Sequence, residues 1–207
     1  ANIESRKNHL STGFVGTKDL MLVLSRIGRS DVAWRLIENE DYPSWGFTIQ
    51  NGATSIWERW NGWTPGKNVD GNFEDPGMNS FAHYAFGAVY QWMAETIGGI
   101  GNDAPGFANI RIAPQPGGSV TWAKGDYDSV RGAIRSSWKI DDDEFMLAVT
   151  IPPNTTATVV VPTSDSIGVM ESGRTVVHAS GVRVVSAGPD SAVLEVGSGS
   201  YEFSAKR

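Results

Sequence analysis

Residues 54–63 form the stretch whose residue types are best suited to catalysis, because they place one carboxylate among three tryptophans. The carboxylate belongs to Glu58, and Arg59 follows it directly. In a sugar site, the C–H faces of a pyranose pack on indole rings, and a carboxylate can take a proton from the water that attacks the anomeric carbon. The other interpretation is that the tryptophans are packing residues and that Glu58 is a surface acid or the partner of Arg59. The stretch alone leaves both interpretations open.

His83 is a second candidate for chemistry. It lies near the start of a predicted helix and shares a face with Gly87 and Tyr90, away from the apolar stripe of that helix. It can therefore point at a ligand hydroxyl, although an interior histidine held by a backbone carbonyl fits the same pattern. The glycines of residues 9–17 suit a tight turn into a first helix and by themselves indicate no more than that.

Helical periodicity in the first hundred residues predicts two helices with almost no loop between them. The first has apolar residues at i, i+3, i+4 and i+7, with Thr17 as its N-cap and Gly28 at its end. The second begins at Ser30, and Asp31 is favourably placed in its first turn. The expected buried stripes are Leu20, Val23, Leu24 and Ile27 in the first helix, and Ala33, Leu36 and Ile37 in the second.

A connection rich in aromatic residues follows and leads to a third helix. So long a connection is uncommon in a compact domain unless it is functional or contains a short helix. Residues 55–61 are predicted to be that helix, with Trp57 and Trp60 on one face. The third helix is expected to start near Asn79 and to stop at a pair of glycines. Its predicted stripe is Ala82, Phe86, Val89, Met93 and Ile97.

After residue 118 the hydrophobic period changes from about 3.6 to about two, which indicates strands. Turn residues separate about eight short strands at the spacing of a β-sandwich. The clearest alternating runs are residues 145–151, 157–161, 182–184 and 192–196. We therefore expect two domains, residues 1–104 and 105–207, with helix ending near Gly98 and strands beginning near Ser119.

Composition excludes several classes of partner. The net charge is −6 with no cluster of Lys or Arg, which argues against nucleic acid, and no apolar run is long enough to cross a membrane. Three scattered histidines and no cysteine give no metal-ligand spacing, so neither a metal nor another cofactor is expected. The first residues show neither an initiator Met nor a signal pattern, which indicates an internal piece of a longer chain and leaves the compartment open.

Four stretches resemble, in their sequences and in their order along the chain, the α-L-rhamnosidases, which are inverting glycoside hydrolases with an (α/α)6 barrel. The stretches are HLSTGFVGT (9–17), ATSIWERW (53–60), NSFAHYAFGAV (79–89) and YDSVRGAIRSSW (127–138). The resemblance covers essentially the whole chain. It implies an α+β chain in two parts, namely the C-terminal helices of the barrel followed by an all-β sandwich.

The resemblance also implies roles for individual residues. Glu58 corresponds to the general base that activates water, and His83 to a residue that contacts the rhamnose of the substrate. Trp57 and Trp60 are assigned to the wall of the pocket. Arg59 is expected to orient Glu58 or to pair with it.

The family's general acid lies in an acid-rich stretch upstream of these motifs, and this sequence begins downstream of it. The chain is therefore expected to be a fragment that carries the base without the acid and is inactive alone. Its expected partners are a rhamnose-containing glycoside and the missing N-terminal part of the barrel, and its exposed barrel helices are expected to allow a homodimer.

Two alternatives remain open from the sequence. One is a carbohydrate-binding or structural β-sandwich with docking helices, for which Trp122 and Trp138 are candidate exposed aromatics. The other is a different (α/α)6 glycosidase, for example one acting on trehalose-like or glucuronyl substrates, because one fold hosts several specificities.

Overall fold

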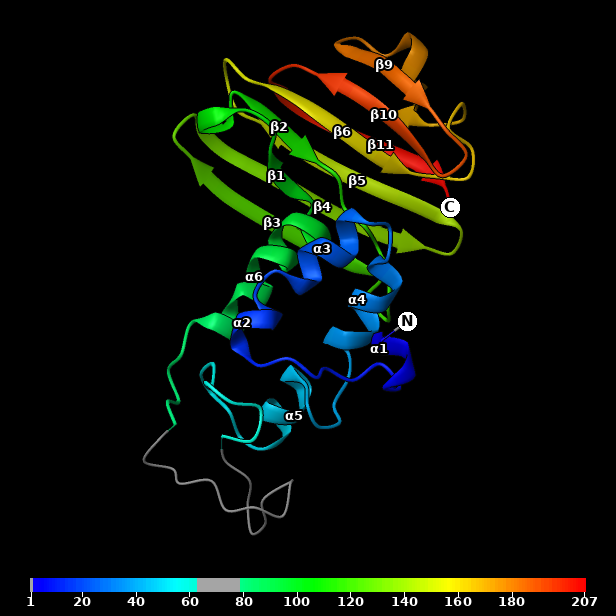
Figure 1. The fold of residues 1–207 in the computed structure, drawn as a ribbon. Coiled ribbons are helices and arrows are strands. Elements are labelled where there is room, and N and C mark those ends of the chain that lie inside the picture. Colours follow the sequence, from blue (N-terminus) through cyan, green and yellow to red (C-terminus); the bar gives the residue numbers. More distant parts are fainter. Residues whose placement is uncertain (1, 63–78) are drawn as a thin grey trace. The chain divides into compact units, whose positions relative to one another are not determined.

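The computed structural model describes residues 2–62 and 79–207. The chain forms two compact units, a helical one over residues 1–92 and one with two β-sheets over residues 93–207 (Figure 1). The predicted succession of helices and then a β-sandwich is confirmed. The predicted domain boundary after residue 104 stays a prediction, and Trp63 lies outside the described residues.

The first helices of the helical unit follow the predicted hairpin. After α1 (Asn2–Ser5), α2 (Phe14–Thr17) is followed closely by α3 (Leu20–Arg26) and α4 (Ser30–Ile37). Thr17 is not the N-cap of α3 as predicted but the last residue of α2, where its hydroxyl donates to the carbonyl of Gly13 at 2.9 Å. Asp31 does lie in the first turn of α4, and its hydrogen bond with Arg29 lowers its pKa to about 2.

The buried face of α3 differs from the predicted stripe. Met21, Leu22 and Leu24 are buried, whereas Val23 and Ile27 are 46% and 65% exposed. The helix is apolar on nearly every side, so the spacing of its apolar residues could not decide which face packs inward. In α4 the prediction was closer, since Ala33 and Leu36 are buried together with Val32 and Trp34.

The short helix of the aromatic connection is α5 (Trp45–Gln50), not residues 55–61 as predicted. Ser44 caps it, with its side-chain oxygen accepting a hydrogen bond from Phe47 N–H at 2.9 Å. Residues 55–61 are not helical because their backbone groups pair with a distant segment: Glu58 N–H donates to the carbonyl of Ser80 at 2.9 Å.

The third predicted helix is shorter and changes type along its length. It begins at Ala85 rather than near Asn79 and consists of a 3-10 turn (Ala85–Ala88), α6 (Val89–Trp92) and a π-helical turn (Met93–Ile97). After Val89 the next buried residues are Trp92 and Thr96, so the predicted stripe through Met93 is wrong. The stop is confirmed: Gly98 N–H donates to the carbonyl of Met93 at 2.8 Å, five residues back.

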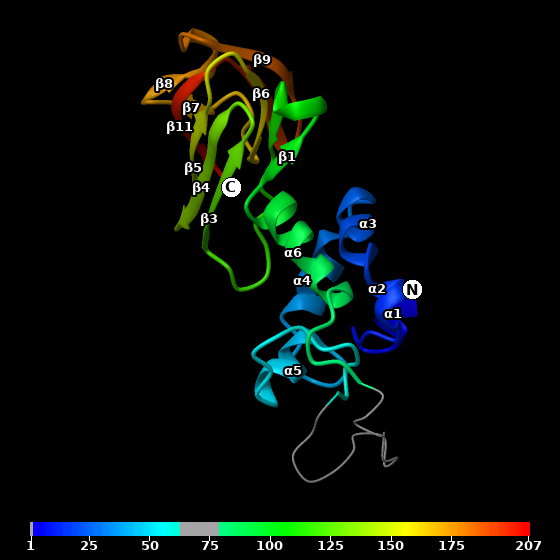
Figure 2. The ribbon, with the colours of Figure 1, turned by 90° about the vertical axis from the view of Figure 1, so that its left-hand side faces the viewer.

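Two sheets form the second unit and lie face to face (Figure 2). The five-stranded sheet has the order β1-β2-β6-β10-β9 and the six-stranded sheet the order β3-β4-β5-β11-β7-β8. The strands are β1 (Ile100–Asn102), β2 (Asn109–Ile112), β3 (Trp122–Ser129), β4 (Gly132–Asp141), β5 (Glu144–Ile151), β6 (Thr156–Pro162), β7 (Met170–Glu171), β8 (Arg174–Thr175), β9 (Val182–Ala187), β10 (Ser191–Val196) and β11 (Gly199–Lys206). A 3-10 turn, Pro105–Phe107, follows β1, and another, Val176–His178, follows β8.

The β part begins at Ile100, earlier than the predicted Ser119. β1 and β2 have only three and four residues, too few to show a clear alternation. All four clearly alternating runs are strands as predicted, and their inward residues fill the core between the two sheets. Trp138 belongs to this core and is 2% exposed, so the expectation that it is an exposed aromatic is wrong. Trp122 is 63% exposed, as expected.

Gly99 is expected to be far less replaceable than Gly173, although both have φ of 77°. A Cβ on Gly99 would lie 2.6 Å from the backbone nitrogen of Pro114, whereas one on Gly173 would meet nothing within 4 Å. Gly173→Ala should therefore lower the free energy of unfolding by about 1–2 kcal/mol from backbone strain. Gly99→Ala should lower it by a further ~1–3 kcal/mol from overpacking. Urea unfolding of both variants measures this, and equal losses would contradict it.

Candidate active site

The candidate site is built on two segments whose backbones pair with each other. Residues 56–58 and 80–83 run side by side: His83 N–H donates to the carbonyl of Ile56 at 2.8 Å, and Glu58 N–H to the carbonyl of Ser80 at 2.9 Å. These bonds satisfy one N–H and one carbonyl in each of the two irregular segments, groups that would otherwise need water. The pairing holds Glu58 and His83 in one region of the helical unit.

Glu58 is also held through its side chain. Its carboxylate oxygen Oε2 accepts a hydrogen bond from Ser80 N–H at 2.8 Å, so the Glu58 and Ser80 residues bond each other in both directions. The Glu58 side chain is half-buried. A bond from a rigid backbone amide fixes the orientation of the carboxylate, which a proton acceptor needs. Arg59 is half-buried as well.

His83 lies just before the 3-10 turn rather than on a helix, so the predicted face shared with Gly87 and Tyr90 is wrong. Its imidazole lies near two rings, with centroid distances of 4.9 Å to Phe14 and 5.3 Å to Tyr84. Nδ1 accepts a bond from Ala85 N–H at 3.4 Å, which directs the proton of a neutral ring to Nε2. The ring is half-buried, and its Nε2 can then donate to a ligand oxygen.

Trp57 and Trp60 are both buried, with 5% and 7% of each residue exposed. Trp60 stacks on Phe86 at a centroid distance of 3.7 Å and meets Trp45 edge-on at 5.2 Å. Trp57 meets Phe81 edge-on at 5.6 Å. Most of each indole thus contacts other residues of this unit and fixes the chain on either side of Glu58.

The stretch 9–17 joins the same region, which its sequence alone did not indicate. The carbonyl of Thr12 accepts a hydrogen bond from Trp60 Nε1 at 3.0 Å, and Phe14 packs on His83. Gly16 permits this path, because a Cβ there would lie 3.0 Å from Cβ of Thr12. The structure therefore brings the three quoted stretches of the helical half together.

Sequence reasoning missed the residues that hold these stretches, namely Ser80, Phe14 and Tyr84. Ser80 lies three residues before His83, but its contribution is a backbone N–H, for which side-chain type gives no signal.

Next to Ser55 and Ile56, a shallow hollow of about 330 Å³ is lined mainly by apolar residues and includes no carboxylate among its described lining. Nor do the described residues bring three His, Asp or Glu side chains close enough to hold a metal ion, and they include no helix that could span a membrane.

Comparison with known proteins shows which family the chain resembles. Residues 1–97 match the family model of the bacterial α-L-rhamnosidase six-hairpin glycosidase domain, and residues 99–175 match that of the bacterial α-L-rhamnosidase C-terminal domain. An α-L-rhamnosidase of Streptomyces avermitilis is 42% identical over 98% of this chain and 18% of its own length. One from Formosa agariphila is 37% identical over 99% of this chain and 22% of its own length.

Solved structures give the same result. The S. avermitilis α-L-rhamnosidase complexed with L-rhamnose has a TM-score of 0.88 and 41% identity, covering 99% of this chain and 19% of that one. The α-L-rhamnosidase of Dictyoglomus thermophilum has a TM-score of 0.84 and 30% identity, covering 99% and 22%. The chain thus spans about a fifth of the length of the relatives it matches. By its sequence and by its fold, the chain belongs to the bacterial α-L-rhamnosidases and corresponds to their C-terminal portion.

Proposed function

We propose that this chain is the C-terminal part of an enzyme that hydrolyses terminal α-L-rhamnosides with inversion at the anomeric carbon. In this proposal the 207 residues supply the general base, Glu58, and part of the sugar pocket. The general acid comes from residues outside this chain, as the family resemblance implies. The solved relative in complex with L-rhamnose supports rhamnose as the sugar that the pocket binds.

The observation that carries the proposal is the two-way bond between Glu58 and Ser80. It fixes a half-buried carboxylate by a backbone amide, at 2.8 Å, beside the segment that holds His83. A surface acid has no need of such a fixed orientation, whereas a base must be aligned with the water it deprotonates.

The inverting mechanism divides the work between two carboxyl groups. They stand about 6.5–9.5 Å apart, which leaves room for a water between the base and the sugar. Glu58 takes a proton from this water as its oxygen bonds to the anomeric carbon. At the same time the acid protonates the departing glycosidic oxygen, so the bond to the aglycone breaks and rhamnose leaves with inverted configuration.

The other site residues have supporting roles in this proposal. His83 donates a hydrogen bond from Nε2 to a hydroxyl of the bound sugar. Trp57 and Trp60 contribute to the pocket wall through what they leave exposed and hold the Glu58 segment by their packing. Arg59 orients or pairs with Glu58. The alternative of another (α/α)6 glycosidase has no specific observation in its favour.

In the intact enzyme, Glu58→Gln is expected to lower kcat by about a hundredfold or more with little change in KM. The amide keeps the shape of the side chain but cannot accept the proton. His83→Ala should mainly raise KM, because its bond to the sugar exists in the ground state and the transition state alike. Steady-state kinetics on a nitrophenyl α-L-rhamnoside separates the two effects.

Glu40→Gln, the same change at an exposed acid outside the site, is the matched control and should leave both constants unchanged. Azide is a nucleophile that needs no base, so it should restore part of the turnover of Glu58→Ala. A near-normal kcat for Glu58→Gln would show that Glu58 is not the base.

The isolated 207-residue chain is expected not to hydrolyse nitrophenyl α-L-rhamnoside at an enzymatic rate. General acid assistance alone contributes about 10²–10⁴-fold, and half of the pocket is expected to be absent as well. The intact enzyme, assayed at the same molar concentration, is the control. Robust turnover by the isolated chain would contradict the division of acid and base between the two parts.

The isolated chain is also expected to dimerise through α2 and α3. Its helical unit is expected to unfold before the β unit. Val15, Val23 and Ile27 are 81%, 46% and 65% exposed, which leaves an apolar face that a neighbouring helix of an intact barrel would cover. Sedimentation velocity should show the dimer, and Val23→Lys with Ile27→Lys should dissociate it. Val177→Lys, a change at a 63% exposed valine of the β unit, should not. A monomer with a single unfolding transition would contradict this prediction.

A further inference from the structure

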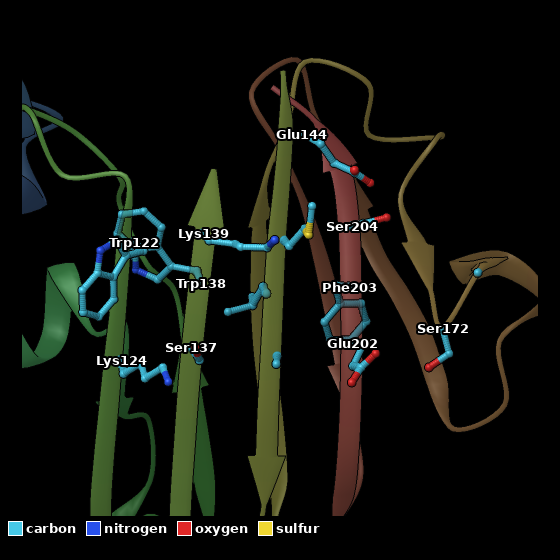
Figure 3. Close-up of a pocket in the computed structure, with 14 residues that line it drawn as sticks. Trp122, Lys124, Ser137, Trp138, Lys139, Glu144, Ser172, Glu202, Phe203 and Ser204 are labelled. Atoms are coloured by element: carbon cyan, nitrogen blue, oxygen red, sulfur yellow. The ribbon is translucent and has the colours of Figure 1, made fainter. Parts of the chain in front are cut away.

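A hollow on the outer face of the six-stranded sheet is separate from the residues assigned to catalysis. Its floor is formed by side chains that point away from the sandwich core, among them Ser137, Ala148 and Ser204. Trp122 and Lys124 of β3 border it on one side, and Ser172, in the turn between β7 and β8, borders it on the other (Figure 3). The hollow therefore spans β3, β4, β5 and β11.

The size of this hollow suits a small ligand. Its volume is about 790 Å³, within the range of roughly 300–1,000 Å³ typical of small-molecule sites. Three strand spacings of ~4.8 Å separate β3 from β11, so the floor is about 14 Å wide. It is open because the two residues at its centre are short: Ser137 on β4 lies opposite Ala148 on β5. The longer Glu202 on β11 lies on the other side of Ala148.

The lining combines one exposed indole with three charged side chains that are unpaired among the described residues. Trp122 is 63% exposed, although tryptophan is on average a highly buried residue. Within the described part of the chain, the side chains of Lys124, Glu144 and Glu202 make neither a hydrogen bond nor an ion pair. Groups of this kind are free to bond a ligand.

The charges of the lining select against a charged ligand. Lys124 and Lys139 are matched in number by Glu144 and Glu202, and Lys139 also lies 3.6 Å from Asp141, so the lining has no net positive charge for an anion and no uniform negative field for a cation. Ammonium groups donate, carboxylates accept, and serine hydroxyls do both. A neutral ligand with many hydroxyls can use all three, and one apolar face of it can pack on the indole of Trp122. A pyranose ring has both properties.

We propose that this hollow is a second saccharide site, which binds a neutral pyranose residue of a glycan on Trp122 without catalysing a reaction. The site is independent of Glu58 and His83 and does not rest on the function proposed for them.

The test uses the 207-residue chain with methyl α-L-rhamnoside and methyl α-D-glucoside up to about 50 mM, well above a Kd near 1 mM. The indole N–H signals are followed by NMR, and the signal missing from Trp122→Ala identifies Trp122. At least one glycoside should shift this signal in a saturable way. Calorimetry should show a Kd about fivefold to tenfold higher for Trp122→Ala, as expected for the loss of one aromatic contact.

A second variant fills the hollow instead of emptying it. Ala148→Tyr adds a large side chain on the floor, outside the core, and should abolish the shift. Ala187→Tyr, the same change at an exposed position of the other sheet, and Tyr127→Ala, on β3 beside Phe107, are the controls and should leave binding unchanged. In the intact enzyme Trp122→Ala should not change kcat on a nitrophenyl rhamnoside, so failure of this proposal and of the catalytic one can be told apart.

Three outcomes would overturn the proposal. The first is no shift of the Trp122 signal with either glycoside. The second is a shift that survives Ala148→Tyr, because the ligand would then lie elsewhere. The third is a dimer of the free chain that Ala148→Tyr dissociates, which would show that a second copy covers the hollow.

Discussion

The backbone pairing between residues 56–58 and 80–83 is the interaction on which the candidate site depends. It prevents both segments from forming the helices that their sequences suggest, and it leaves the third helix to begin only at Ala85. It also positions Glu58 and His83, the two candidate site residues, without a long regular element. Irregular backbone at functional sites is common because loops held by a rigid scaffold can aim side chains in directions that helices and strands do not allow.

Buried tryptophans hold distant parts of the chain together within each unit, including the segments beside the candidate site. Four of them donate an indole N–H to a residue far along the chain, and each bond lies within one unit. The pairs are Trp45 with the carbonyl of Phe86, Trp60 with that of Thr12, Trp92 with the hydroxyl of Ser25, and Trp138 with the carbonyl of Ile97. An indole combines a large apolar surface with one polar atom, so it can fill a core and at the same time satisfy an unpaired carbonyl.

Periodicity predicted the elements whose burial is one-sided, such as α4, β5 and β10. It failed where a helix is apolar all round, as α3 is, because the pattern then contains no information on which face packs inward. It also missed α5, whose six residues are too few for a stripe. Of the candidate site, the sequence identified Glu58 and His83 by type and resemblance. The amide of Ser80 could not be predicted because every residue other than proline has one.

The place of β11 in the six-stranded sheet has a consequence for biosynthesis. This strand lies between β5 and β7, and its partners on β5 lie 48 residues earlier in the chain at Gly199 and 62 residues earlier at Lys206. Ribosomes extend a chain by about 5–20 residues per second, so β5 waits for several seconds with an unpaired edge. Exposed edges of apolar strands invite pairing with other chains. The nascent sandwich is thus open to mispairing with other chains in the interval before residues 199–206 emerge.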